Sequence, residues 1–193
     1  MSEDFRERTK LLEKVSQNSK SLDIHAAVKV PMLKERLKYF GIKSRYFTSR
    51  TINSIVSMKK LSKWADPKIL PPSPWNLSKK FISNIKKPLY GSSMLEKLAS
   101  YNSAINYHNK HTGDYACNMR LFEATGLGCT LITDHKNDLH EYFAIDSEII
   151  SYSSAEEASE KIDFLMENPS IGRKIGIAGQ KKCLEVFNTQ NQI

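Results

Sequence analysis

Apolar residues recur at helical spacing through the first third of the chain. Residues 5–17 (FRERTKLLEKVSQ) carry their apolar side chains on one face with charges elsewhere, which predicts an amphipathic helix. The short apolar run 21–30 predicts a strand, and 31–40, opened by a proline, predicts a second helix that Gly41 is well placed to end. A similar pattern over 51–65 predicts a third helix.

Prolines interrupt this pattern between residues 66 and 87. The stretch contains four of the chain's seven prolines before residue 75, and neither a regular helix nor a central strand tolerates that density. We therefore expect 66–87 to be a Pro-rich surface connection. Because both flanks look like parts of one fold, we expect a single domain over 1–193.

From residue 92 onward, short apolar runs alternate with helical patterns. Ser153 and Ser154 precede two glutamates in a capping-box pattern, which predicts the start of one of these helices. Strands that alternate with helices form parallel sheets with both faces covered. The fold class is therefore α/β, a Rossmann-like parallel sheet with helices on both faces. We expect helices at 92–100, 118–125 and 138–143, one that ends at 168 and one from 169 to about 187, and strands at 103–107, 129–133 and 148–152.

Charge is distributed unevenly along the chain. The formal net charge is +8, but residues 1–100 carry +13 and residues 101–193 carry −5. A basic half indicates an anionic partner, such as a membrane surface or a phosphorylated ligand, or else a lysine-rich solvated face. Its basic residues are mostly lysines with no accompanying nucleic-acid-binding motif, which argues against nucleic acid.

The chain of 193 residues, 40% hydrophobic and 26% charged, has the composition of a globular protein. No apolar run reaches the ~18 residues of a membrane-spanning helix, and the N-terminus does not have the pattern of a secretory signal. The three cysteines are far apart and form no CxxC pair, which argues against a disulfide framework. We expect a cytoplasmic protein, with peripheral contact to an anionic membrane as one option.

The segment 107–134 is where chemistry is expected. In parallel α/β sheets, ligands bind beyond the carboxyl ends of the strands. Here a predicted strand enters a polar loop, and the helix that begins near Asn118 presents N–H groups that favour a phosphate. Arg120 can add a bidentate contact, and Glu123, one turn on, can accept hydrogen bonds from sugar hydroxyls.

Each of these residues also has a purely structural interpretation. Asn118 is a suitable N-cap, and Arg120 and Glu123 are spaced for an ion pair on the helix surface. The Gly126–Gly128 turn fits a simple helix stop. His108 and His111 could be metal ligands, but nothing nearby completes a set of three or four, so we expect no metal.

The run NMRLFEATGLGCTLITD, residues 118–134, resembles the nucleotide-sugar-binding half of GT-B glycosyltransferases. It is most similar to CgeB-like "glycosyl transferases group 1" proteins, related to glycosyltransferase family 4. The R-x-FEA-x-x-x-G segment of that group corresponds to Arg120, 122–124 and Gly128, followed by an apolar strand and Asp134. The resemblance covers roughly 88–187, including the final helix with its AGQKK sequence, and more loosely 6–24.

The resemblance implies transfer of a sugar from a nucleotide-sugar to an acceptor hydroxyl, in surface polysaccharide or glycan synthesis. It places Glu123 at the ribose and Asn118 and Arg120 near the donor diphosphate, while the preceding loop, with His111 and Gly113, lines the sugar side. It implies no cofactor besides the nucleotide-sugar, which is the donor substrate. It does not identify the catalytic residues.

Three departures from the family shape the functional hypotheses. Tyr115 stands where family 4 enzymes carry an earlier glutamate, and the family's opening strand and glycine loop do not precede the first helix. The chain is also too short for an acceptor domain. We therefore expect the donor-binding domain of a glycosyltransferase, truncated or working with a separate acceptor-binding protein. The alternatives are a non-catalytic nucleotide- or polyanion-binding module that uses the basic half, and a degenerate remnant.

Overall fold

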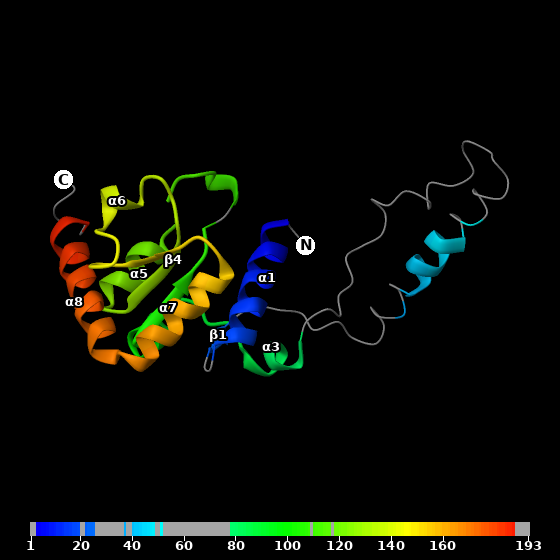
Figure 1. Cartoon of the computed structure of the whole chain (residues 1–193), viewed down its shortest axis with the longest axis horizontal. Helices are drawn as coiled ribbons and strands as arrows, with labels where there is room; N and C mark the ends of the chain where they lie inside the picture. Colours follow the sequence, from blue (N-terminus) through cyan, green and yellow to red (C-terminus); the bar gives the residue numbers. More distant parts are fainter. Residues whose placement is uncertain are drawn as a thin grey trace. The chain divides into compact units, whose positions relative to one another are not determined.

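The structure is a computed structural model that describes residues 3–19, 22–25, 37, 40–48, 51, 78–108, 110–116 and 118–187 (Figure 1). The chain divides into two compact units, one made of 1–26 with 83–193 and the other of 27–82. The single-domain organisation expected from the sequence stays a prediction. The helix predicted at 51–65 lies outside the described residues apart from its first residue, and so do most of 31–40 and the strand positions after residue 25.

Two predictions in the middle of the chain are wrong. Gly41 does not end a helix, because residues 40–48 are helical and Gly41 is not among the glycines with positive φ. The end of the predicted 66–87 connection is also structured, with a helix α3 (Lys79–Asn84) and a strand β2 (Ile85–Lys86). The four prolines of that stretch all precede residue 78, so the backbone N–H groups beyond it remain available for hydrogen bonds.

The larger unit confirms the predicted α/β class. Strand β1 (Ile24–His25) pairs in parallel with β2, and β3 (Ser103–Asn106), β4 (Thr130–Asp134) and β5 (Ile150–Tyr152) form a second parallel sheet in the order β3-β4-β5. The described helices of this unit are α1 (Glu3–Asn18), α4 (Ser92–Ala99), α5 (Arg120–Gly126), α6 (Leu139–Tyr142), α7 (Ala155–Glu167) and α8 (Pro169–Val186), with a 3₁₀ turn η3 (Lys110–Thr112).

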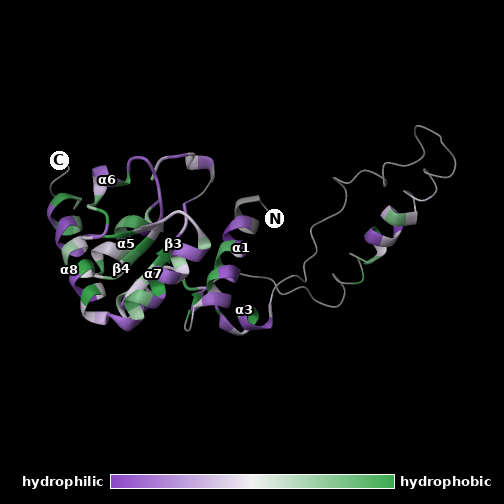
Figure 2. Ribbon diagram, in the orientation of Figure 1, coloured by the Kyte–Doolittle hydropathy of each residue, from purple (hydrophilic) through white to green (hydrophobic). Residues whose placement is uncertain are grey.

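Helices cover both faces of the three-stranded sheet. Successive residues of a strand point to opposite faces, so neighbouring residues of one strand belong to different core clusters. Ile105, Ile132 and Ile150 face a core cluster with α1 and α7. Their neighbours Ala104 and Leu131 face a second cluster with α5 and the end of α4. Figure 2 shows hydrophobic residues along β3 and β4, between helices that also carry hydrophilic turns.

The starts of α7 and α8 lie where the sequence predicts them. The predicted capping contacts are confirmed only for α7. Ser154 accepts a hydrogen bond from the Glu157 N–H at the start of α7, and the Glu157 carboxylate accepts one from the Ser153 N–H. These reciprocal bonds are a capping box. At the start of α8, the Asn168 side chain instead donates back to the Phe164 carbonyl of α7.

Candidate functional site

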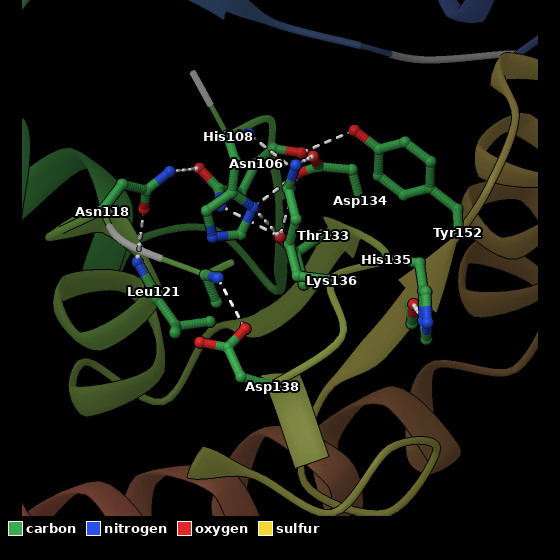
Figure 3. Close-up of polar contacts among 12 residues, drawn as sticks. Asn106, His108, Asn118, Leu121, Thr133, Asp134, His135, Lys136, Asp138 and Tyr152 are labelled. Atoms are coloured by element: carbon green, nitrogen blue, oxygen red, sulfur yellow. Dashed lines mark hydrogen bonds and ion pairs between the residues drawn. The ribbon is translucent and has the colours of Figure 1, made fainter. Parts of the chain in front are cut away.

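Polar side chains gather where β3, β4 and β5 end, at the carboxyl edge of the sheet (Figure 3). Asn106, the last residue of β3, donates to Thr133 Oγ1 of β4 at 3.0 Å, and its backbone carbonyl accepts from the Tyr152 hydroxyl of β5 at 2.6 Å. Burial, together with the charge of Asp134, raises the pKa of Tyr152, which keeps this hydroxyl protonated as a donor. The network fixes the three strand ends relative to one another.

Asn118 joins this network to helix α5. Its amide nitrogen donates to Asn106 Oδ1 at 3.0 Å, and its Oδ1 accepts from the Leu121 N–H at 3.1 Å. The second bond satisfies an N–H of the first helical turn, as an N-cap side chain does. Asn118 therefore holds the first turn of α5 from outside the helix, whose N-cap residue is Met119, and its contact with a donor diphosphate stays a prediction.

Asp134, at the end of β4, holds the start of the loop that follows β3. Its Oδ1 accepts from the His108 N–H at 2.8 Å and lies 2.7 Å from His108 Nδ1. The His108 side chain is fully buried, and its Nε2 lacks a hydrogen-bond partner within the described part of the chain. Lys136 adds a cation 3.8 Å from Asp134 Oδ2.

The polar loop after β3 lies above this edge and carries two of the residues predicted to bind the donor. His111 is exposed on the turn η3. Gly113 takes a left-handed conformation with φ 60°, and its carbonyl accepts from Lys136 Nζ at 2.7 Å. The loop is thus tied to the β4 end through Lys136, and the roles of His111 and Gly113 at the sugar stay predictions.

Arg120 and Glu123 form the ion pair that their spacing allows. Arg120 Nη1 lies 3.4 Å from Glu123 Oε2, and the two side chains are 36% and 25% exposed. Arg120 Nη1 also lies 2.9 Å from the sulfur of Met94 on α4. Both charged groups are therefore held at the first turn of α5 while still reaching solvent.

A second arginine, Arg8 of α1, lines the same cavity as Arg120. Glu7, the residue before it, accepts a hydrogen bond from the Tyr107 hydroxyl at 3.4 Å, so this part of α1 lies at the carboxyl edge of β3. The surrounding protein and the positive charge of Arg120 lower the pKa of Arg8. Two guanidinium groups from different helices thus face one cavity, where an anion between them would relieve their repulsion.

The cavity has a volume of about 530 Å³ and runs from these arginines along β3 toward the amino ends of the strands. A second cavity of about 440 Å³ lies between Tyr107, Asp134 and the start of α7 at Ser154. The second cavity, lined by Asp134 and Tyr152, lies at the carboxyl edge, which is where ligands bind in parallel α/β sheets.

The cysteines and the possible metal ligands are a separate feature of the chain. Cys129 is buried, and burial raises the pKa of its thiol to about 11. Cys117 lies outside the described residues. Within the ranges that the structure describes, no group of three or more histidine, cysteine or acidic side chains is placed to hold a metal ion. The expectation that no metal is needed stays a prediction.

Sequence reasoning missed Arg8, Asn106, Thr133 and Tyr152. Asn106 and Thr133 carry a weak signal, since each is a polar residue at the end of an otherwise apolar strand. Arg8 carries no local signal, because it is one of several charged residues on an amphipathic helix. Its place beside Arg120, more than a hundred residues away in sequence, follows only from the packing of α1 against the sheet.

The fold and the site define an α/β protein whose polar and cationic groups gather at the carboxyl edge of a parallel sheet. Residues 50–193 match the family model described as glycosyl transferase-like. The chain belongs to this glycosyl transferase-like family. The predicted GT-B resemblance is confirmed at that level, and the CgeB-like branch stays a prediction. A search of curated proteins gave no match. In the described segments, no helix combines the length and apolar character needed to cross a membrane.

Proposed function

We propose that the chain binds a nucleotide-sugar at the carboxyl edge of the sheet and provides the donor half of a glycosyl transfer reaction. The observation that carries the proposal is the pair Arg8 and Arg120, which line one cavity from two helices. A diphosphate carries negative charge that two guanidinium groups can bind through paired N–H donors. Membership of the glycosyl transferase-like family supports the same reaction class.

In the proposed reaction, an acceptor hydroxyl oxygen forms a bond to the anomeric carbon of the donor sugar. The bond from that carbon to the diphosphate breaks, and the nucleoside diphosphate leaves with the bonding electrons. The hydroxyl proton passes to a base or to water. Arg8 and Arg120 would stabilise the charge that develops on the leaving diphosphate, and Glu123 would accept hydrogen bonds from the ribose.

The acceptor would be bound by a further domain or a separate protein, because the carboxyl edge of a single α/β unit provides one wall of a closed site. We further propose a cytoplasmic setting for glycan synthesis. Cys129 and Cys183 are both buried free thiols, a state that a reducing compartment maintains.

Calorimetric titration tests the donor site directly. The chain is titrated with UDP, GDP and dTDP and their common sugar conjugates, and the best ligand is repeated with Arg8→Ala and Arg120→Ala. We expect saturable binding of one nucleotide, and a loss of at least about tenfold in affinity for each variant, equivalent to roughly 1.4 kcal/mol.

Arg173→Ala is the matched control, since Arg173 is an exposed arginine of α8 that is not among the residues lining the cavity. Its affinity should equal that of the unaltered chain. If all three variants lose affinity alike, the arginines act only through net charge, and the polyanion-binding alternative gains support. If no nucleotide binds a demonstrably folded chain, the proposal fails.

A further inference from the structure

The second cavity lies at the carboxyl edge of the sheet, apart from the one that Arg8 and Arg120 line. It has a volume of about 440 Å³ and is lined by α1, by the residues at the ends of β3, β4 and β5, and by the start of α7. None of the described residues lines both cavities. Leu11 and Leu12 line one cavity each, so α1 forms a wall of both. The second cavity is large enough for a small molecule, since such sites measure ~300–1,000 Å³.

One part of this lining is apolar and aromatic. Leu11 packs against the core cluster that contains Tyr152, and Tyr152 is buried. The Tyr152 hydroxyl already donates to the Asn106 carbonyl, and the Tyr107 hydroxyl donates to Glu7. The two tyrosines in the lining therefore offer mainly ring surface to a ligand. The C–H groups of a sugar ring can pack against such a surface.

Other groups in the lining keep hydrogen-bonding capacity. Asp134 Oδ1 accepts from His108, whereas the contact seen for Asp134 Oδ2 within the described residues is Lys136 Nζ at 3.8 Å, too long for a hydrogen bond. The exposed His135 ring lies 3.3 Å from Ser151 Oγ through Nδ1, and no contact of its Nε2 is seen in the described structure (Figure 3). A carboxylate accepts hydrogen bonds, and an imidazole nitrogen donates or accepts them. Both groups therefore remain available to the hydroxyl groups of a ligand.

Charge favours a neutral ligand over an anion in this cavity. Asp134 lies in the lining, and the first turn of α7 carries Glu156 and Glu157. These acidic residues already complement the positive end of the helix dipole. Ser154 Oγ accepts from the Glu157 N–H, and the Glu157 carboxylate accepts from the Ser153 N–H. A phosphate would lie near these carboxylates and be repelled by them, whereas neutral hydroxyl groups match both the carboxylate acceptors and the serine hydroxyls.

We propose that this cavity binds a sugar ring of the acceptor through its hydroxyl groups. Asp134 Oδ2 accepts from the ring hydroxyls, with His135 and Ser153 as further partners. The carbon face of the ring packs against Tyr107 and Tyr152. The donor sugar is covalently joined to its diphosphate, which the proposed function places in the other cavity, so the acceptor assignment rests on that function. This chain provides one wall of the acceptor site, and the further domain or protein provides the other.

Saturation-transfer difference NMR of the full chain with methyl glycosides of glucose, galactose, mannose and N-acetylglucosamine tests the inference. We expect one glycoside to bind, and a saturating amount of the preferred nucleotide-sugar to change its affinity by less than about twofold. His135→Ala should weaken the binding of that glycoside by at least about threefold, as expected for the loss of one hydrogen bond, and should leave the nucleotide affinity unchanged in calorimetry. His140→Ala is the matched control, since His140 is an exposed histidine of α6 that is not among the residues lining the cavity. It should change neither affinity.

The inference is overturned if none of the glycosides binds a chain that circular dichroism shows to be folded, or if His135→Ala and His140→Ala behave alike. It is also overturned if the nucleotide-sugar displaces the glycoside, because the cavity would then hold the donor sugar. Nucleotide binding without glycoside binding would overturn this inference and leave the proposed function standing. Glycoside binding without nucleotide binding would overturn the proposed function, and with it the assignment of the saccharide to an acceptor.

Discussion

The sequence left two interpretations of Glu123 open, an ion pair with Arg120 on the helix surface and a contact with the ribose of the nucleotide. Its ion pair with Arg120 at 3.4 Å is present, and one quarter of its side chain remains exposed. A partly exposed pair of this kind contributes only a few tenths of a kcal/mol to stability. The carboxylate therefore remains free to exchange part of this contact for a ligand hydroxyl, and its ribose contact stays a prediction.

We predict that Glu123→Ala lowers the affinity for the preferred nucleoside diphosphate by about tenfold, roughly 1.4 kcal/mol. The affinity for inorganic pyrophosphate should stay the same or increase, because Arg120 keeps its charge and loses a competing carboxylate. Calorimetry with both ligands measures the difference. Glu160→Ala, at an exposed position of α7, is the control and should change neither affinity.

An equal loss for pyrophosphate and nucleotide would show that Glu123 acts only by holding Arg120. Unchanged affinity for both ligands would remove Glu123 from the site. Circular dichroism of the variant confirms that the fold is retained in either case.

At the scale of elements, α8 packs closely against α5 and against the turn that precedes β5. A Cβ placed on Gly179 would lie 2.3 Å from the Glu148 carbonyl oxygen and 2.8 Å from Thr125 Cγ2. One on Gly172 would lie 3.3 Å from Leu165 Cδ2, the end of a flexible side chain. The two glycines of one helix therefore differ in how much space they leave.

We predict that Gly179→Ala destabilises the fold by about 2 kcal/mol or more, because backbone must move to relieve the clash. Gly172→Ala should change stability by less than about 1 kcal/mol, since Leu165 can adjust and alanine favours the helix. Urea unfolding of both variants measures this contrast. Equal effects would contradict the close approach of α8 to the Glu148 backbone.

Tyr101, just before β3, connects the two sheets through its hydroxyl. Its hydroxyl donates to Asp23 at 2.7 Å, just before β1, and Asp23 also accepts from Lys86 of β2. The hydrogen bonds from Lys86 and Tyr101 lower the pKa of Asp23. Burial and the bond to Asp23 raise the pKa of Tyr101 to about 12.

We predict that Tyr101→Phe lowers the free energy of unfolding by about 1 kcal/mol near neutral pH. Because folding lowers the pKa of Asp23, the stabilisation that its ionised carboxylate provides is complete above the unfolded-state pKa of ~3.9. It is lost as pH falls through the folded-state pKa. Because folding raises the pKa of Tyr101, the stabilisation that its protonated hydroxyl provides is complete below the unfolded-state pKa of ~10. It is lost as pH rises through the folded-state pKa of about 12.

Urea unfolding of Tyr101→Phe and the unaltered chain between pH 3 and pH 11 measures this window. Tyr142→Phe is the control, because Tyr142 makes ring contacts and no hydroxyl hydrogen bond is seen for it in the described structure. A Tyr101→Phe effect that stays constant at acid pH would show that Asp23 is not the relevant partner.

The elements from residue 92 onward could be predicted from sequence because each is a local pattern. Apolar runs gave β3, β4 and β5, and the serine-glutamate pattern gave the start of α7. The predictions were wrong where they rested on the presence of proline or glycine alone. The prolines of 66–87 hid α3 and β2 behind them, and Gly41 was treated as a helix end although glycine also occurs within helices.

At the scale of the molecule, the candidate site is assembled from segments far apart in sequence. The motif around Arg120 and Glu123 predicted the family and the general location, and residues 50–193 confirm the family. Arg8, Asn106 and Tyr152 could not be predicted, because their roles depend on which strand ends meet and on how α1 packs. Sequence patterns describe elements well and long-range contacts poorly.

The measurement that tests the account most directly is hydrogen exchange of the full chain with and without its preferred nucleoside diphosphate at saturation. We predict slower exchange in the first half of α1, in the loop between β3 and α5 and in the first turn of α5, with α8 unchanged. Arg8 lies in the first half of α1 and Arg120 opens α5, and both residues line the same cavity. Saturable binding that leaves all three segments unchanged, or that protects only residues 27–82, would contradict the account.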